Sequence, residues 1–225
     1  MTTLRQAARL ARKDLRLELR TRDVVTGVGL YALLVVVVAS FAFPTGGEHG
    51  DTIAAGLLWF AFLFAILLGV GRSLALEHDD ACIDALVASP LRRESIYLGK
   101  VLSNLAFVGA TQLVVLPIAV VLLGLAPGRG LVLLLATVVT ATLALVAVAT
   151  LLSAIAVNTR TREAILPVLV VPVAIPVLIA AVGATETALG GGLVADAGPW
   201  LALLAAAAVL SLSVGLLTFR HLLEE

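Results

Sequence analysis

The residues best suited to chemistry form a polar segment from Glu77 to Pro90. Within it, the carboxylates Asp80 and Asp84 stand about one helical turn apart. They adjoin an apolar helical stripe made of three residues, Ile83, Leu86 and Val87. Pro90 is expected to end this short helix, because the residue before a proline disfavours the helical conformation. Such a helix suits docking to a partner protein, and a solvated polar loop is the alternative interpretation.

No residue pattern in the sequence indicates an enzyme. Gly99-Lys100 is the only Gly-Lys pair, but Glu94 and Val101 stand where a phosphate-binding loop needs Gly and Ser or Thr. The three histidines are far apart in sequence and lie outside the apolar stretches: His49, His78 and His221. We therefore expect no catalytic residue, no metal site and no bound cofactor in this chain.

The chain on either side of this polar segment is strongly apolar. Of 225 residues, 61% are hydrophobic and 13% are charged, against roughly 45–50% and 25% in soluble domains. This composition excludes a soluble globular domain and a disordered chain. The 15 basic and 15 acidic residues cancel, so nucleic acid is not an expected partner. A single cysteine, Cys82, cannot form an intramolecular disulfide.

Six stretches are apolar and long enough to cross a membrane, which takes about 20 residues in a helix. The predicted spans cover residues 24–43, 53–72, 101–125, 131–157, 164–184 and 198–219. Residues 4–22 precede the first span, and residues 73–100 form the largest predicted loop. The sequence therefore predicts an all-α integral membrane protein with one membrane domain over residues 1–225.

The positions of Lys and Arg predict the orientation. Seven of the 15 precede the first span, and seven more follow the second and fourth spans or lie near the C-terminus. Only Arg129 remains for the opposite face. Since cytoplasmic segments carry an excess of Lys and Arg, both termini and the 73–100 loop are expected in the cytoplasm.

The N-terminal segment has an amphipathic helical pattern. Its apolar residues are Leu4, Ala8, Ala11, Leu15 and Leu19. Its arginines repeat the same spacing one residue later, at Arg5, Arg9, Arg12, Arg16 and Arg20. This pattern favours a helix at the surface of an anionic leaflet. A basic flank that only sets the orientation is the alternative.

Prolines interrupt two predicted spans. The fifth span contains Pro167, Pro172 and Pro176, and the third contains Pro117. Each removes a backbone donor, so we expect a kinked or broken fifth span. The bends are interpreted either as static kinks or as places that flex with a partner. The centre of every span lacks ionisable residues, which disfavours an ion-driven carrier.

Several short motifs resemble those of the heme exporter protein B (CcmB) family, the permease subunit of the cytochrome c maturation ABC transporter. The resemblance is carried by residues 12–18, 56–59, 72–77, 88–90, 96–100 and 166–178, and by the acidic C-terminal end. It implies an ABC-2-type exporter permease in the bacterial cytoplasmic (inner) membrane. The implied partners are an ATP-binding cassette subunit, a haem-handling membrane subunit, a small membrane peptide and a periplasmic haem chaperone, with two copies of this chain per complex.

The resemblance also implies a non-catalytic role, in which ATP is bound by the partner and haem is handled by the complex. ATP hydrolysis would be coupled to release of the haem-loaded chaperone. The residues expected to contact the ATPase are Glu77, Asp80, Ile83, Asp84, Leu86, Val87 and Pro90. Two other functions stay open at this point: export of a lipid, glycan or drug, and a membrane scaffold that transports nothing.

Overall fold

The computed structural model describes residues 3–21, 23–43, 49–79, 93–156 and 162–222, and every regular element in these ranges is helical. The seven α-helices and one 3-10 turn are α1 (Thr3–Thr21), α2 (Asp23–Ala42), α3 (Gly50–Asp79), α5 (Arg93–Leu122), η1 (Gly128–Gly130), α6 (Leu131–Ala156), α7 (Arg162–Leu189) and α8 (Gly198–Leu222).

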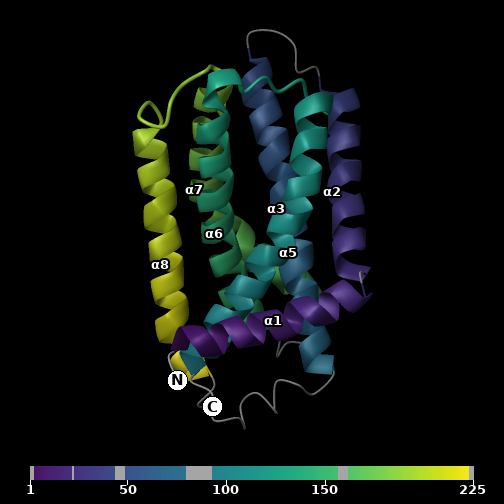
Figure 1. Cartoon of the computed structure of the whole chain (residues 1–225), viewed down its shortest axis with the longest axis vertical. Helices are drawn as coiled ribbons and strands as arrows, with labels where there is room; N and C mark the ends of the chain where they lie inside the picture. Colours follow the sequence, from purple (N-terminus) through teal and green to yellow (C-terminus); the bar gives the residue numbers. More distant parts are fainter. Residues whose placement is uncertain (1–2, 22, 44–48, 80–92, 157–161, 223–225) are drawn as a thin grey trace.

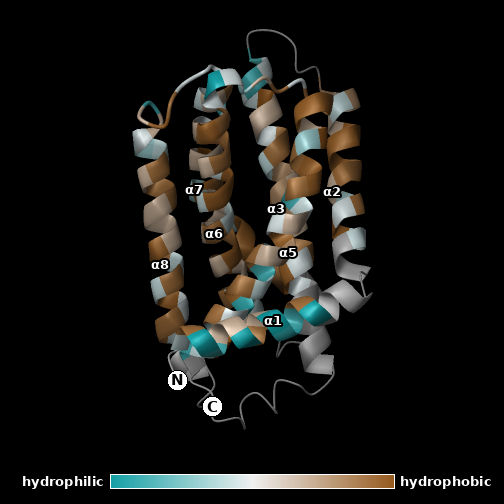
Figure 2. Ribbon diagram, in the orientation of Figure 1, coloured by the Kyte–Doolittle hydropathy of each residue, from teal (hydrophilic) through white to brown (hydrophobic). Residues whose placement is uncertain are grey.

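Helices α2 to α8 form an up-and-down bundle, and α1 lies across one end of it (Figure 1). The start of α1 and the end of α8 lie at this same end. Apolar residues dominate the bundle, whereas hydrophilic residues gather on α1 and at the opposite tip (Figure 2). Helix α6 packs extensively against both α7 and α8, and α1 packs mainly on α5.

In the part of the chain that the structure describes, five helices contain stretches long and apolar enough to cross a membrane: α3, α5, α6, α7 and α8. In α2 the corresponding stretch, Thr26–Ala42, is shorter. The six predicted spans thus correspond to six helices, but the first one stays a prediction as a membrane span. The whole of α2 has 20 residues, about the length that a crossing needs.

The helices extend further toward the α1 end than the predicted spans do. Helix α3 continues past residue 72 to Asp79, and α5 begins at Arg93 rather than near residue 101. Helical backbone groups satisfy one another within the helix, so polar side chains can extend a span into water. The predicted loop 73–100 is therefore helical at both ends, up to Asp79 and from Arg93 onward.

A buried tryptophan links α3 to α7. The Trp59 side chain is fully buried, and its Nε1–H donates a hydrogen bond to Thr185 Oγ1 at 2.9 Å. Its ring packs edge-on against Phe62, with 5.7 Å between centroids. A buried indole N–H needs such a partner, because an unpaired donor in an apolar surrounding is costly.

Two hydrogen-bonded pairs connect α5 to α6 inside the bundle. Asn104 Nδ2 donates to Thr150 Oγ1 at 3.0 Å, and Gln112 Nε2 donates to Thr142 Oγ1 at 2.8 Å. All four side chains are buried. The pairs are eight residues apart on both helices, so together they fix the register of the antiparallel α5–α6 pair. Asn104 and Gln112 are neutral, so the absence of ionisable residues from the span centres gives no indication of these pairs.

Helix α7 continues without a break from Arg162 to Leu189 through its three prolines. The interpretation of this span as a broken helix is therefore wrong, while bending at Pro167, Pro172 and Pro176 stays a prediction. Pro172 and Pro176 are exposed on the outside of the bundle, as is Pro117 of α5. A proline facing outward keeps its ring away from neighbouring helices, and it costs the helix one internal hydrogen bond.

Candidate functional site

The predicted ATPase-contact residues fall mostly outside the described residues. Glu77 belongs to the last turns of α3, and its side chain is not among those described. The other six lie outside the described ranges: Asp80, Ile83, Asp84, Leu86, Val87 and Pro90. Their proposed role stays a prediction. The flanking ends of α3 and α5 lie at the end of the bundle that α1 crosses (Figure 1).

The best-defined polar arrangement at this end is the α1–α5 junction, formed by residues 6–14 of α1 and 95–100 of α5. Ala7, Leu10 and Ala11 are buried against α5. Gly99 permits this close approach, because a Cβ at Gly99 would lie 2.7 Å from Leu10 Cδ2 and 3.2 Å from the Ala7 carbonyl oxygen. The junction therefore depends on small residues on both helices.

A buried ion pair fastens the junction. Lys100 Nζ lies 2.9 Å from Asp14 Oδ2, with the two side chains only 3% and 12% exposed. Nearby, Ser95 Oγ donates a hydrogen bond to Gln6 Oε1 at 3.0 Å. A buried ammonium group requires such a partner, because desolvation of an unpaired charge costs several kcal/mol, roughly. The ion pair thus ties α1 to the base of α5.

Tyr97 connects the same turn of α5 to two further helices. Its side chain is fully buried, and its hydroxyl lies within hydrogen-bond distance of the carbonyl oxygens of Ala147 in α6 and Ser211 in α8, at 3.1 and 3.5 Å. Gly215 of α8 leaves the space that the ring occupies. The five residues from Ile96 to Lys100 therefore contact α1, α6 and α8.

The buried stripe of α1 differs from the predicted apolar stripe. The residues that face α5 are Ala7, Leu10, Ala11 and Asp14. Leu4 is 70% exposed and Ala8 is exposed as well. The close contact with α5 requires small side chains and includes the carboxylate that pairs with Lys100. A prediction from hydropathy instead gives most weight to leucines. Among the side chains of α1 that the structure describes, only Ala11 belongs to both stripes.

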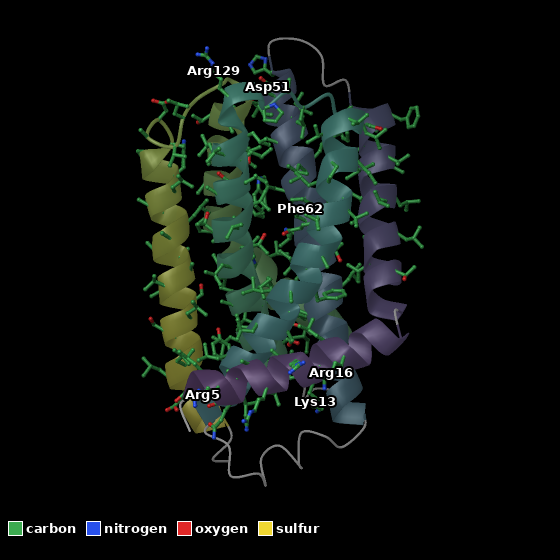
Figure 3. All side chains as sticks on the ribbon, viewed as in Figure 1. Arg5, Lys13, Arg16, Asp51, Phe62 and Arg129 are labelled. Carbon is green, nitrogen blue, oxygen red and sulfur yellow. The ribbon has the colours of Figure 1, made fainter. Side chains whose placement is uncertain are left out.

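The arginines of α1 lie on its outer surface. Arg5, Arg9, Arg12 and Arg16 are all exposed, while the side chain of Arg20 is outside the described set. Figure 3 shows Arg5, Lys13 and Arg16 along α1, and Arg129 and Asp51 at the opposite end of the bundle. The predicted separation of basic residues is therefore visible in the described part of the chain.

The contacts of the junction connect α1, α5, α6 and α8. The junction holds one buried ion pair, a tyrosine hydroxyl on backbone carbonyls and closely packed small residues. Within the described ranges, no three His, Cys, Asp or Glu residues lie close enough to hold a metal ion. Tyr97 connects the base of α5 directly to α6 and α8.

Comparisons with known proteins agree on one family. The family model described as CcmB protein matches residues 5–224. The chain is 32% identical to heme exporter protein B of Rhodobacter capsulatus over 171 residues, covering 76% of this chain and 78% of the relative. It is 31% identical to heme exporter protein B of Paracoccus denitrificans over 210 residues, covering 92% of each. The protein of the same name from Bradyrhizobium diazoefficiens is 30% identical over 208 residues, covering 92% of this chain and 91% of the relative.

Proposed function

Since the chain belongs to the CcmB protein family, we propose that it is the membrane permease subunit of an ABC transporter that exports or delivers haem for cytochrome c biogenesis. The observation that carries this proposal is the family match over residues 5–224, in a bundle whose helices are long and apolar enough to cross a membrane. The chain itself is non-catalytic, and ATP is bound and hydrolysed by a partner subunit.

The proposed placement is the bacterial inner membrane, with α2, α3, α5, α6, α7 and α8 as six spans and both termini in the cytoplasm. The distribution of Lys and Arg supports this orientation. Helix α1 then lies at the cytoplasmic interface, because it crosses the end of the bundle and carries exposed arginines (Figure 3).

ATP-driven motion of the partner acts on the segment from Glu77 to Pro90. Carboxylates at Glu77 and Asp84 make polar contacts with the ATPase, while Ile83, Leu86 and Val87 enter an apolar groove on it. The segment joins α3 to α5, and α5 contacts α1, α6 and α8 through the turn from Ile96 to Lys100. These contacts give the motion a physical route into the bundle.

The complex also contains a haem-handling membrane subunit, a small membrane peptide and a periplasmic haem chaperone, with two copies of this chain. Haem is the cargo of the complex. ATP hydrolysis is coupled to release of the haem-loaded chaperone on the periplasmic side.

Purification of the tagged chain in mild detergent, followed by mass spectrometry, tests the proposal. We expect a P-loop ATPase together with cytochrome c maturation proteins. Recovery of the ATPase alone would indicate another cargo. Recovery of neither, from cells that express both, would indicate a scaffold.

The proposed contact segment is tested by charge reversal. Glu77→Lys and Asp84→Lys should each weaken retention of the ATPase, because a contact between opposite charges becomes a repulsive one. Asp51→Lys, which changes an exposed carboxylate at the opposite end of the bundle, is the matched control (Figure 3). Equal retention in all three variants and the unchanged chain contradicts the assignment of this segment.

A further inference from the structure

Helix α1 presents three different surfaces around its circumference. The first faces α5 and consists of Ala7, Leu10, Ala11 and Asp14. At 3.6 residues per turn, these four lie within about 100° of one another. Gln6, which accepts a hydrogen bond from Ser95 of α5, widens this contact to about 140°, so more than half of the circumference faces away from α5.

The second surface is apolar and adjoins the first. Leu4 is 70% exposed, Ala8 is exposed and Leu15 is half-buried. Helical geometry places these three residues on one edge of α1, about 90° from the protein contact. An exposed leucine beside a docked face is suited to an apolar solvent, which for this bundle is the acyl region of a bilayer.

The third surface is basic and lies opposite the protein contact. Arg5, Arg9, Arg12 and Arg16 fall within about 60° of one another, beside the apolar edge. All four are exposed. Guanidinium groups bind phosphate oxygens through paired hydrogen bonds, and their aliphatic stems tolerate apolar surroundings.

The orientation of α1 lets the apolar and basic surfaces contact lipid together. Its axis crosses the bundle helices near their ends (Figure 1), so it runs along the interface if the bundle spans the membrane. Leucines of the apolar edge then reach acyl chains while neighbouring arginines remain at the depth of the headgroups. At the other end of the bundle, the described residues include the exposed acidic side chains Asp51, Glu186 and Asp196.

We propose that α1 binds anionic phospholipids, with Arg5, Arg12 and Arg16 contacting headgroup phosphates and Leu4 entering the adjacent acyl region. The inference rests on the membrane placement proposed above and not on the haem role. Through Asp14 and Lys100, a lipid-bound α1 is held against the base of α5.

The test is native mass spectrometry of the purified full chain with its co-purifying partners, titrated with phosphatidylglycerol or phosphatidylcholine. The unchanged protein should bind phosphatidylglycerol more tightly. Replacing Arg5, Arg12 and Arg16 by Gln should lower this preference by about fivefold for each arginine at low salt, which corresponds to about 1 kcal/mol per basic residue near an anionic surface. Arg129→Gln, at the opposite end, is the matched control and should change nothing.

An equal lipid preference in the triple Gln variant and the unchanged protein overturns the proposal. Loss of the ATPase from that variant with an unchanged lipid preference also overturns it, and assigns the arginine face to an acidic protein. If the triple Gln variant unfolds, the same three arginines are replaced by Lys instead. This variant keeps the positive charges, so it must retain the preference for phosphatidylglycerol, and loss of the preference overturns the proposal. The lipid preference is measured on this chain, so a complex without haem-related partners but with the preference intact contradicts the proposed function alone.

Discussion

Removal of Asp14 is expected to release α1 from the bundle. Asp14→Ala removes the carboxylate that lies 2.9 Å from the ammonium group of Lys100, which is 3% exposed. Breaking a buried ion pair by removing one partner costs about 3–5 kcal/mol, because the remaining charge stays desolvated. Each 1.4 kcal/mol is a factor of ten, so the population with α1 undocked should rise by about two to four orders of magnitude.

The reciprocal substitution should be milder. Lys100→Met leaves Asp14 with Lys13, whose Nζ lies 4.0 Å from Asp14 Oδ1, and Asp14 also lies nearer the surface, at 12% exposed, and can be hydrated. The double variant Asp14→Leu/Lys100→Met should recover most of the lost stability, since apolar replacement of a whole buried ion pair is often neutral or stabilising. The structure thus predicts the order Asp14→Ala, Lys100→Met and double variant, from most to least destabilised.

Limited trypsin digestion measures this release, because α1 contains five arginines and one lysine. The cleavage rate within α1 is compared with thermal unfolding of the whole bundle, followed by tryptophan fluorescence. We expect faster cleavage of α1 in Asp14→Ala with a much smaller effect on the bundle. Equal cleavage in Asp14→Ala and the unchanged protein, or a double variant worse than both single ones, would refute the argument that the ion pair holds α1.

Three further substitutions, with Gly109→Ala as a control, test the packing. Gly99→Ala should destabilise the junction by about 1–3 kcal/mol through overpacking, whereas Gly109→Ala, with open space at its Cβ, should be neutral or stabilising in the same thermal unfolding assay. Thr185→Val should cost about 0.6–1.7 kcal/mol by removing the partner of the Trp59 indole, visible as a lower unfolding temperature and a shifted tryptophan emission. Gln112→Leu should cost a similar amount, and an unchanged unfolding temperature would show that its bond to α6 contributes nothing.

Much of the helical architecture could be predicted from hydropathy. Apolar stretches of at least 20 residues identified all six bundle helices, because the hydrocarbon core fixes the minimum length of a span. The helix ends were less predictable. Polar residues after residue 72 look like a loop in a hydropathy pattern, whereas an α-helix can continue into water, as α3 does to Asp79.

The junction was harder to predict from sequence. Lys100 was counted among the cytoplasmic charges, and nothing local shows that it is buried, because its partner Asp14 lies 86 residues earlier. The same holds for Asn104 and Gln112, whose amides are paired only when α6 folds against α5. A search restricted to ionisable residues in spans misses such neutral pairs. The signal available in the sequence was the tight succession of Tyr97, Gly99 and Lys100 at the start of a span.

The paired amides of α5 have a consequence for how the chain is assembled. Helices α5 and α6 are consecutive and joined by a short connection, so they can pair as a helical hairpin during synthesis, before α7 and α8 exist. Sliding one helix past the other by a turn would leave both amides of α5 without acceptors in hydrocarbon, where no water is available to replace them. Correct registration of the nascent hairpin is therefore encoded within residues 93–156, and the later helices add to a template whose alignment is already set.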